Sequence, residues 1–152
     1  MTERADFDRE VRVAIARSIR ERGAIPTMHD VARALGREAP DVDASFARMI
    51  EGHVFIPREG SHEIHAYDPF CTDPTAFRVS AGGRDWSAIC GWDALGVPPA
   101  LGASGTIDAR CGDCDEPLHI VVGRDGSATA ESGTLLQIGV PAREFWTNIR
   151  FT

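Results

Sequence analysis

A cysteine and an aspartate three positions apart are the residues in this sequence best suited to joint chemistry. Cys90 follows an expected strand, and Asp93 lies in the expected helical turn after it. Side chains at this spacing share one face of a helix, so the thiol and the carboxyl are expected to be neighbours. A thiolate is a nucleophile and a soft metal ligand, and a partly buried carboxyl can carry a proton to a leaving group. In the structural alternative, Cys90 is a small buried apolar residue and Asp93 a helix cap, and the pattern alone leaves both open.

Three further cysteines widen the possible thiol chemistry. Cys111 and Cys114 form a single CxxC motif, which is half of a typical zinc site. Acidic neighbours indicate a turn here, whereas a thioredoxin-type motif opens a helix. Cys71 lies between two turn dipeptides, either near the mouth of the site or as an exposed thiol. Cys90, Cys111, Cys114 and Cys71 are therefore all candidate metal ligands, and together they could close a tetrahedral zinc site.

Residues 1–67 are expected to form three amphipathic helices and a hairpin. Apolar residues recur at helical spacing in the first helix, and Thr27 with Asp30 resembles a capping box at the start of the second. The helices are expected over residues 6–22, 27–36 and 40–52, and the hairpin strands over 53–57 and 63–67. This order of elements is typical of a winged helix.

Residues 75–152 are expected to form a second module of short strands. Asp68-Pro69 and Asp73-Pro74 mark residues 68–74 as a linker. One or two helical turns should follow Cys90 and stop at Pro98-Pro99. Strands are expected at 77–80, 86–89, 105–109, 118–122, 128–131, 135–140 and 147–151, with a short helix over 141–145. The fold class is therefore α+β with mostly antiparallel pairing.

Composition argues against export and against a membrane span. The chain begins with charged residues, where a signal peptide needs an apolar segment, and it contains no apolar run of about 18 residues. A cytoplasmic protein with reduced thiols is expected. Since the chain needs no cofactor in this interpretation, a bound metal would be a ligand or a product, and a homodimer is compatible with the sequence.

A DNA-binding regulator is the competing hypothesis, because winged helices often bind DNA. The net charge is −7 and all 16 basic residues are arginines. An acidic chain repels phosphate unless its cations gather on one face. The exposed positions expected on the third helix are mostly of the wrong sign, namely Asp41, Asp43, Ser45, Arg48 and Glu51. Nucleic acid is therefore not the expected partner.

The segment around Cys90 resembles the signature of the alkylmercury lyase family. In that signature a catalytic cysteine precedes a catalytic aspartate by three positions. The similar segment here is Cys90-Gly91-Trp92-Asp93-Ala94-Leu95 followed by Gly96-Val97-Pro98. Asp68-Pro69-Phe70 and residues 74–79 resemble the approach to that strand. Residues 107–111 resemble the strand carrying the family's non-catalytic cysteine, so Cys111 would be mainly structural and Cys114 could help to hold metal.

The resemblance implies protonolysis of a carbon–mercury bond in an organomercurial substrate. Cys90 would capture the substrate and Asp93 would protonate the carbon leaving group. Hg(II) would remain on sulfur for transfer to a thiol carrier or a mercuric reductase. The family's second catalytic cysteine is expected about where this sequence ends, at Thr152. Four explanations stay open: a truncated sequence, a naturally shortened relative, another thiol as the second ligand, or a selenocysteine encoded at a recoded stop. A non-catalytic relative that binds Zn or Hg through its thiols, or a metal-responsive regulator, is the alternative.

Overall fold

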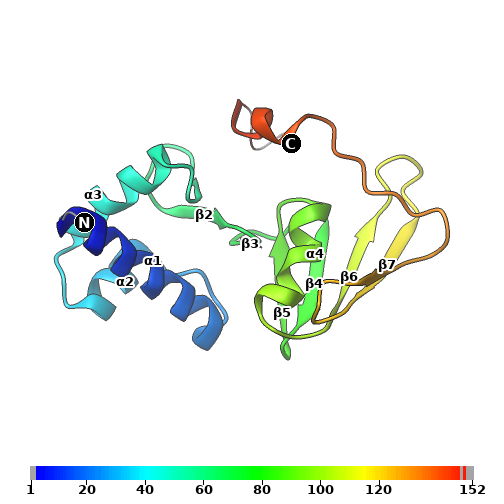
Figure 1. Ribbon diagram of the computed structural model, residues 1–152, viewed down its shortest axis with the longest axis horizontal. Coiled ribbons are helices and arrows are strands. Elements are labelled where there is room, and N and C mark those ends of the chain that lie inside the picture. Colours follow the sequence, from blue (N-terminus) through cyan, green and yellow to red (C-terminus); the bar gives the residue numbers. More distant parts are fainter. Residues whose placement is uncertain (1–2, 148, 150–152) are drawn as a thin grey trace. The chain divides into compact units, whose positions relative to one another are not determined.

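The computed structural model describes residues 3–147 and 149 and divides into two compact units, Met1–Tyr67 and Asp68–Thr152 (Figure 1). None of the helices in these residues is long and apolar enough to cross a membrane. Each unit has its own buried apolar residues. The units are therefore described separately.

The first unit consists of three helices and a two-stranded hairpin. Helix α1 (Glu3–Arg22) buries Val11, Ile15 and Ile19 on one face. Helix α2 (Met28–Leu35) starts at the predicted capping box and ends at Gly36, which adopts the left-handed conformation that glycine tolerates best. Helix α3 (Ala39–Glu51) follows, and strands β1 (Ile56–Pro57) and β2 (Ile64–Tyr67) pair antiparallel. These elements match the predicted order, while the winged-helix assignment itself stays a prediction.

Two residues expected on the exposed face of α3 pack inward instead. Ser45 is fully buried and donates a hydrogen bond to Asp8 of α1. The guanidinium of Arg48 donates to both carboxylate oxygens of Asp8. These hydrogen bonds hold the pKa of Asp8 below its ordinary value, against the opposing effect of its burial. Arg48, the basic residue that DNA binding by α3 would require, is therefore paired with Asp8 and joins α1 to α3.

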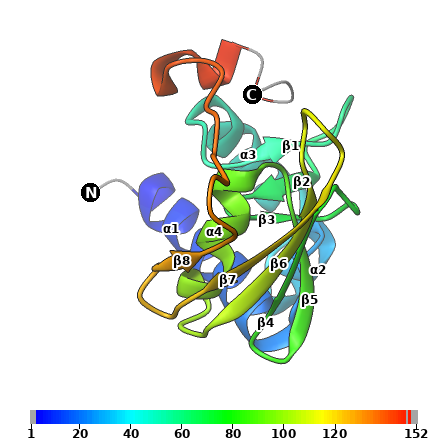
Figure 2. The same ribbon diagram turned by 90° about the vertical axis from the view of Figure 1, so that its right-hand side faces the viewer.

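The second unit is an antiparallel sheet with one helix against it. Its strands lie in the order β3-β5-β4-β6-β7-β8. Their bounds are β3 Phe70–Cys71, β4 Phe77–Ala81, β5 Arg84–Ala88, β6 Gly105–Arg110, β7 Pro117–Val122 and β8 Ala128–Thr129. Helix α4 (Gly91–Ala100) contacts β3, β4, β5 and β6 (Figure 2). Val79, Val97 and Ile107 are buried between helix and sheet, which confirms the α+β class.

Two expectations near the site were wrong. Residues 68–74 are not simply a linker, because β3 lies within them and pairs with β5. Helix α4 does not stop at Pro98-Pro99 but includes both prolines in its last turn, where the Leu101 N–H donates to Val97 and Pro98 carbonyls. Pro98 is fully buried, and a Cβ added to Gly105 would lie 3.1 Å from its Cγ. We attribute the longer helix to this packing, which offsets the missing N–H groups.

The C-terminal part also differs from the sequence-based expectation. Residues 135–140 form no strand, and Leu135 is 90% exposed. A strand needs a neighbouring edge for its hydrogen bonds, and the two-residue β8 already occupies the edge of β7. The short helix after Pro141 is present as the 3₁₀ helix η1 (Ala142–Thr147). The last strand, expected at 147–151, falls largely outside the described residues.

Candidate active site

Cys90 occupies the N-cap position of α4. Its backbone is extended, with φ −140° and ψ 174°, and its Sγ accepts the N–H of Asp93 at 3.5 Å. A side-chain acceptor at this position satisfies one of the free N–H groups that begin every helix. The helix start also favours negative charge, so it supports a thiolate at sulfur. Cys90, and not Asp93, is therefore the cap, and capping does not exclude a chemical role.

The structure brings the Cys90 thiol and the Asp93 carboxyl together. Both side chains lie at the first turn of α4, close enough that each shifts the pKa of the other. Burial and the negative charge of Asp68 together raise the pKa of Asp93 from 3.8 to about 6, although the neighbouring Cys90 side chain opposes this shift. A carboxyl with a pKa near 6 exchanges protons readily close to neutral pH.

The thiol itself is held in its protonated form. Burial raises the pKa of Cys90 and the nearby Asp93 carboxylate raises it too, while the Asp93 and Trp92 N–H groups favour the thiolate. Burial is the largest of these effects. The resting site therefore pairs a neutral thiol with a carboxylate that can accept its proton.

Asp68 is a third member of this site that the sequence analysis did not assign a role. It lies at the surface, yet surrounding protein atoms remove enough water to raise its pKa as well. The next residue, Pro69, packs on α4: a Cβ added to Gly96 would lie 3.3 Å from the Pro69 Cβ. Phe70 then packs on Trp86 with ring centroids 4.9 Å apart. The only sequence signal was the Asp-Pro-Phe segment within the family resemblance.

Comparison with known proteins shows the family and the fold of this chain. The family model of alkylmercury lyase matches residues 70–152, which is more than half of the chain and includes Cys90 and Asp93. The chain belongs to the alkylmercury lyase family. A solved structure described as the mercury-bound form of MerB2 is similar to it in fold, with a TM-score of 0.61 at 20% identity, covering 83% of this chain and 67% of that one. No curated protein matches the chain.

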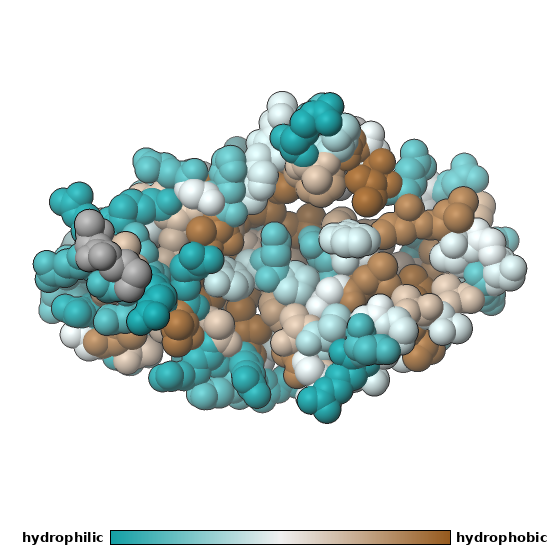
Figure 3. Space-filling model, viewed as in Figure 1, coloured by the Kyte–Doolittle hydropathy of each residue, from teal (hydrophilic) through white to brown (hydrophobic). Residues whose placement is uncertain are grey.

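Two apolar side chains, Leu136 and Phe77, pack next to Gly91, the residue after the thiol, in this alkylmercury lyase family member. A Cβ added to Gly91 would lie 2.8 Å from Cδ1 of Leu136 and 3.4 Å from Cε1 of Phe77. Leu136 belongs to the segment after β8. Trp92, two residues after the thiol, is 62% exposed. Figure 3 shows apolar surface on the second unit.

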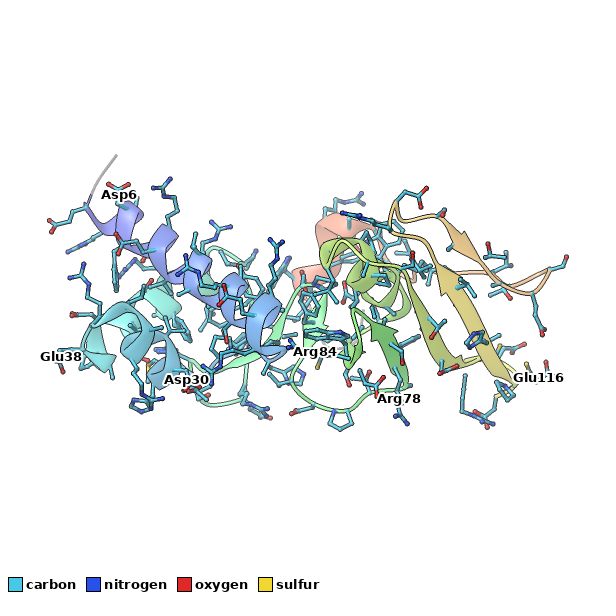
Figure 4. All side chains as sticks on the ribbon, turned by 90° about the horizontal axis from the view of Figure 1, so that it is seen from below. Asp6, Asp30, Glu38, Arg78, Arg84 and Glu116 are labelled. Atoms are coloured by element: carbon cyan, nitrogen blue, oxygen red, sulfur yellow. The ribbon has the colours of Figure 1, made fainter. Side chains whose placement is uncertain are left out.

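Cys71 lies on the wrong face of the sheet to join Cys90. It pairs with Ser87, whereas Phe77, which approaches α4 at Gly91, pairs with Ala88. Neighbouring residues of a strand point to opposite faces, so Cys71 points away from α4. Arg78 lies on this same outer face, and Figure 4 shows it projecting from β4.

Cys111 and Cys114 lie in the turn between β6 and β7, separate from Cys90. The described residues contain no group of three or more histidine, cysteine, aspartate and glutamate side chains that could hold a metal ion. The structure therefore does not assemble the four cysteines into one tetrahedral zinc site. An open hollow of about 290 Å³ surrounds the β4–β5 turn, lined by residues 80–85 and Ser104. It lies at the other end of β4 and β5 from Cys90 and includes none of the candidate residues.

Proposed function

We propose that this protein is an organomercurial lyase in which Cys90 captures the substrate and Asp93 delivers the proton that breaks the carbon–mercury bond. The proposal depends on one observation, that the Cys90 thiol and the Asp93 carboxyl are neighbours at the start of α4, where the Asp93 N–H donates to Cys90 Sγ. Family membership and the fold of the mercury-bound relative support the same reaction class.

Capture begins from an organomercury thiolate, R–Hg–SR′. The sulfur of Cys90 bonds to mercury and displaces R′S⁻, while the S–H proton passes to the Asp93 carboxylate. Burial keeps the free thiol protonated, because it raises the pKa of Cys90. Transfer of the proton to Asp93 becomes favourable only when mercury bonds to sulfur and withdraws electron density from it. The products of the step are Cys90–S–Hg–R and a neutral Asp93 carboxylic acid.

Protonolysis then uses the proton that the thiol supplied. Asp93 protonates the carbon bonded to mercury, and the electron pair of the carbon–mercury bond forms the new C–H bond. The hydrocarbon R–H leaves, and the mercury on Cys90 carries a positive charge beside the restored Asp93 carboxylate. Burial and the Asp68 charge favour the neutral acid before this step, so Asp68 acts as a positioning residue for the proton.

Release needs thiols from outside this site. The displaced R′S⁻ binds the cysteine-held mercury, and one further R′SH returns a proton to Cys90 and carries off Hg(SR′)₂. The net reaction converts R–Hg–SR′ and R′SH into R–H and Hg(SR′)₂. A small thiol in the assay can therefore complete the mercury coordination that Cys90 begins.

The test measures benzene release from phenylmercury in the presence of excess small thiol. We expect Cys90→Ser to abolish release and Asp93→Asn to reduce it by about 100-fold or more, while mass spectrometry still finds the phenylmercury adduct on Asp93→Asn. Cys71→Ser is the matched control, because this thiol faces away from α4 and its loss should leave the rate unchanged.

Two results would contradict the lyase. Stoichiometric mercury binding to the unaltered protein without hydrocarbon release would favour the non-catalytic metal-binding alternative. Benzene release that survives Cys90→Ser would assign the chemistry to another group.

A further inference from the structure

Backbone hydrogen bonds close the turn that contains Cys111 and Cys114. The Cys111 N–H donates to the Glu116 carbonyl at 2.9 Å, and the Asp115 N–H donates to the Cys111 carbonyl at 3.0 Å. These bonds close the loop at the tip of the β6–β7 hairpin, where Figure 4 shows Glu116. Asp115 has a positive φ of 58°, which turns the chain immediately after the second cysteine.

The two cysteines of this turn lie close to each other. The side chains of Cys111 and Cys114 interact, and the backbone N–H groups of Asp113 and Cys114 lie near the Cys111 thiol. Two neighbouring thiols in one closed turn can bind the same ion.

Access and the neighbouring charges also suit a ligand site. Cys114 is exposed and Cys111 is half-exposed. Arg110 forms a two-bond ion pair with Asp115, at 2.6 and 2.8 Å, which fixes the start of the turn against its end. The loop is therefore pre-organised before any ion binds, so little ordering is needed on binding.

We propose that Cys111 and Cys114 form a second site, a two-thiolate chelate for a soft cation, and that Hg(II) is the ion it takes. Mercury(II) is satisfied by two thiolates, whereas structural zinc takes four ligands. Among the described residues, no group of three or more histidine, cysteine, aspartate and glutamate side chains is arranged to hold a metal ion at this turn. Binding exchanges thiols: Hg(SR′)₂ and the two protein thiols give the chelate and two R′SH.

The chelate is separate from the Cys90 site and does not depend on carbon–mercury cleavage. Register places both at the same end of the sheet, since Cys90 follows β5 and Cys111 follows β6. Strand β4 lies between β5 and β6, so the two chain paths are separated by two inter-strand spacings, about 10 Å in total. Mercury could pass between the sites on a small thiol, but one ion is not shared by both in this conformation.

The test uses full-length protein with Cys71→Ser and Cys90→Ser, so that only the CxxC thiols remain. Hg(II) is added as its complex with a monothiol, and bound mercury is followed by native mass spectrometry and by sulfur-to-mercury absorption in the ultraviolet. We expect one Hg(II) per chain. Because the second sulfur acts at an effective concentration of millimolar or more, about 0.1 mM competing monothiol should strip mercury at least about 10-fold more easily after Cys114→Ser.

Several outcomes would overturn the chelate. These are equal mercury retention after Cys111→Ser or Cys114→Ser, one ion bridging two chains, a Cys111–Cys114 disulfide that persists in reductant, and zinc that Hg(II) does not displace. Far-ultraviolet circular dichroism of each variant separates loss of binding from loss of the fold. Since Cys90 is absent throughout, failure of the lyase proposal leaves this result unaffected.

Discussion

Replacing Asp93 by asparagine should stabilise the protein at neutral pH while it destroys proton delivery. The shift in the pKa of Asp93 from 3.8 to about 6 corresponds to about 3 kcal/mol at 1.36 kcal/mol per unit. Asp93 is only partly buried, so solvent screening reduces this to about 1–2 kcal/mol. Loss of a favourable charge at the start of α4 removes about 0.5 kcal/mol of the gain. We expect Asp93→Asn to gain about 1 kcal/mol in free energy of unfolding at pH 8.

The gain should depend on pH in a defined direction. A carboxyl whose pKa is raised by folding contributes stability that is fully present below its unfolded pKa, 3.8 here, and is lost as the pH rises through about 6. Asparagine does not titrate. The difference between Asp93→Asn and the unaltered protein should therefore be largest at pH 8 and shrink towards pH 5.

Urea unfolding followed by circular dichroism at pH 5, 6.5 and 8 measures this difference. Glu59→Gln is the control, because Glu59 is exposed in the loop between β1 and β2 and its replacement should change stability little at any of these pH values. A variant that is no more stable than the unaltered protein at pH 8, with a difference independent of pH, would refute the argument that a buried charge sits at the start of α4.

Further predictions concern the same site and the first unit. In a pH–rate profile, activity should fall as the pH decreases through about 6, because Asp93 becomes protonated. Asp68→Asn should move the midpoint of this fall to lower pH, since the Asp68 charge raises the pKa of Asp93. An unmoved midpoint would remove Asp68 from the site. Gly91→Ala should clash with Leu136, and a double-mutant cycle with Leu136→Ala should show a coupling above about 0.5 kcal/mol in unfolding free energy; simple additivity would mean that the segment after β8 does not pack there. In the first unit, Asp8→Asn should destabilise the fold at pH 7. That loss should fade as the pH falls below 3.8, because the lowered pKa of Asp8 contributes stability only where the carboxyl is ionised.

Local features could be predicted from the sequence because they depend on backbone periodicity and nearby side chains. The capping box at Thr27 and Asp30 formed as expected, because both partners lie within one helical turn. Cys90 and Asp93 came together for the same reason. The strands at 105–109 and 118–122 were also found within one residue of their bounds, since turn residues separate them.

Features that depend on distant segments were decided only by the tertiary structure. Asp68 reaches the site through the packing of Pro69 on α4, and Leu136 covers Gly91 from a segment that forms no strand. The helix continues through Pro98 because that side chain is buried, and Cys71 is excluded by the pairing of β3 with β5. The sequence alone determines which residues are adjacent on one turn or strand. Which of them share a site with distant residues depends on packing and strand register, and no local spacing encodes these.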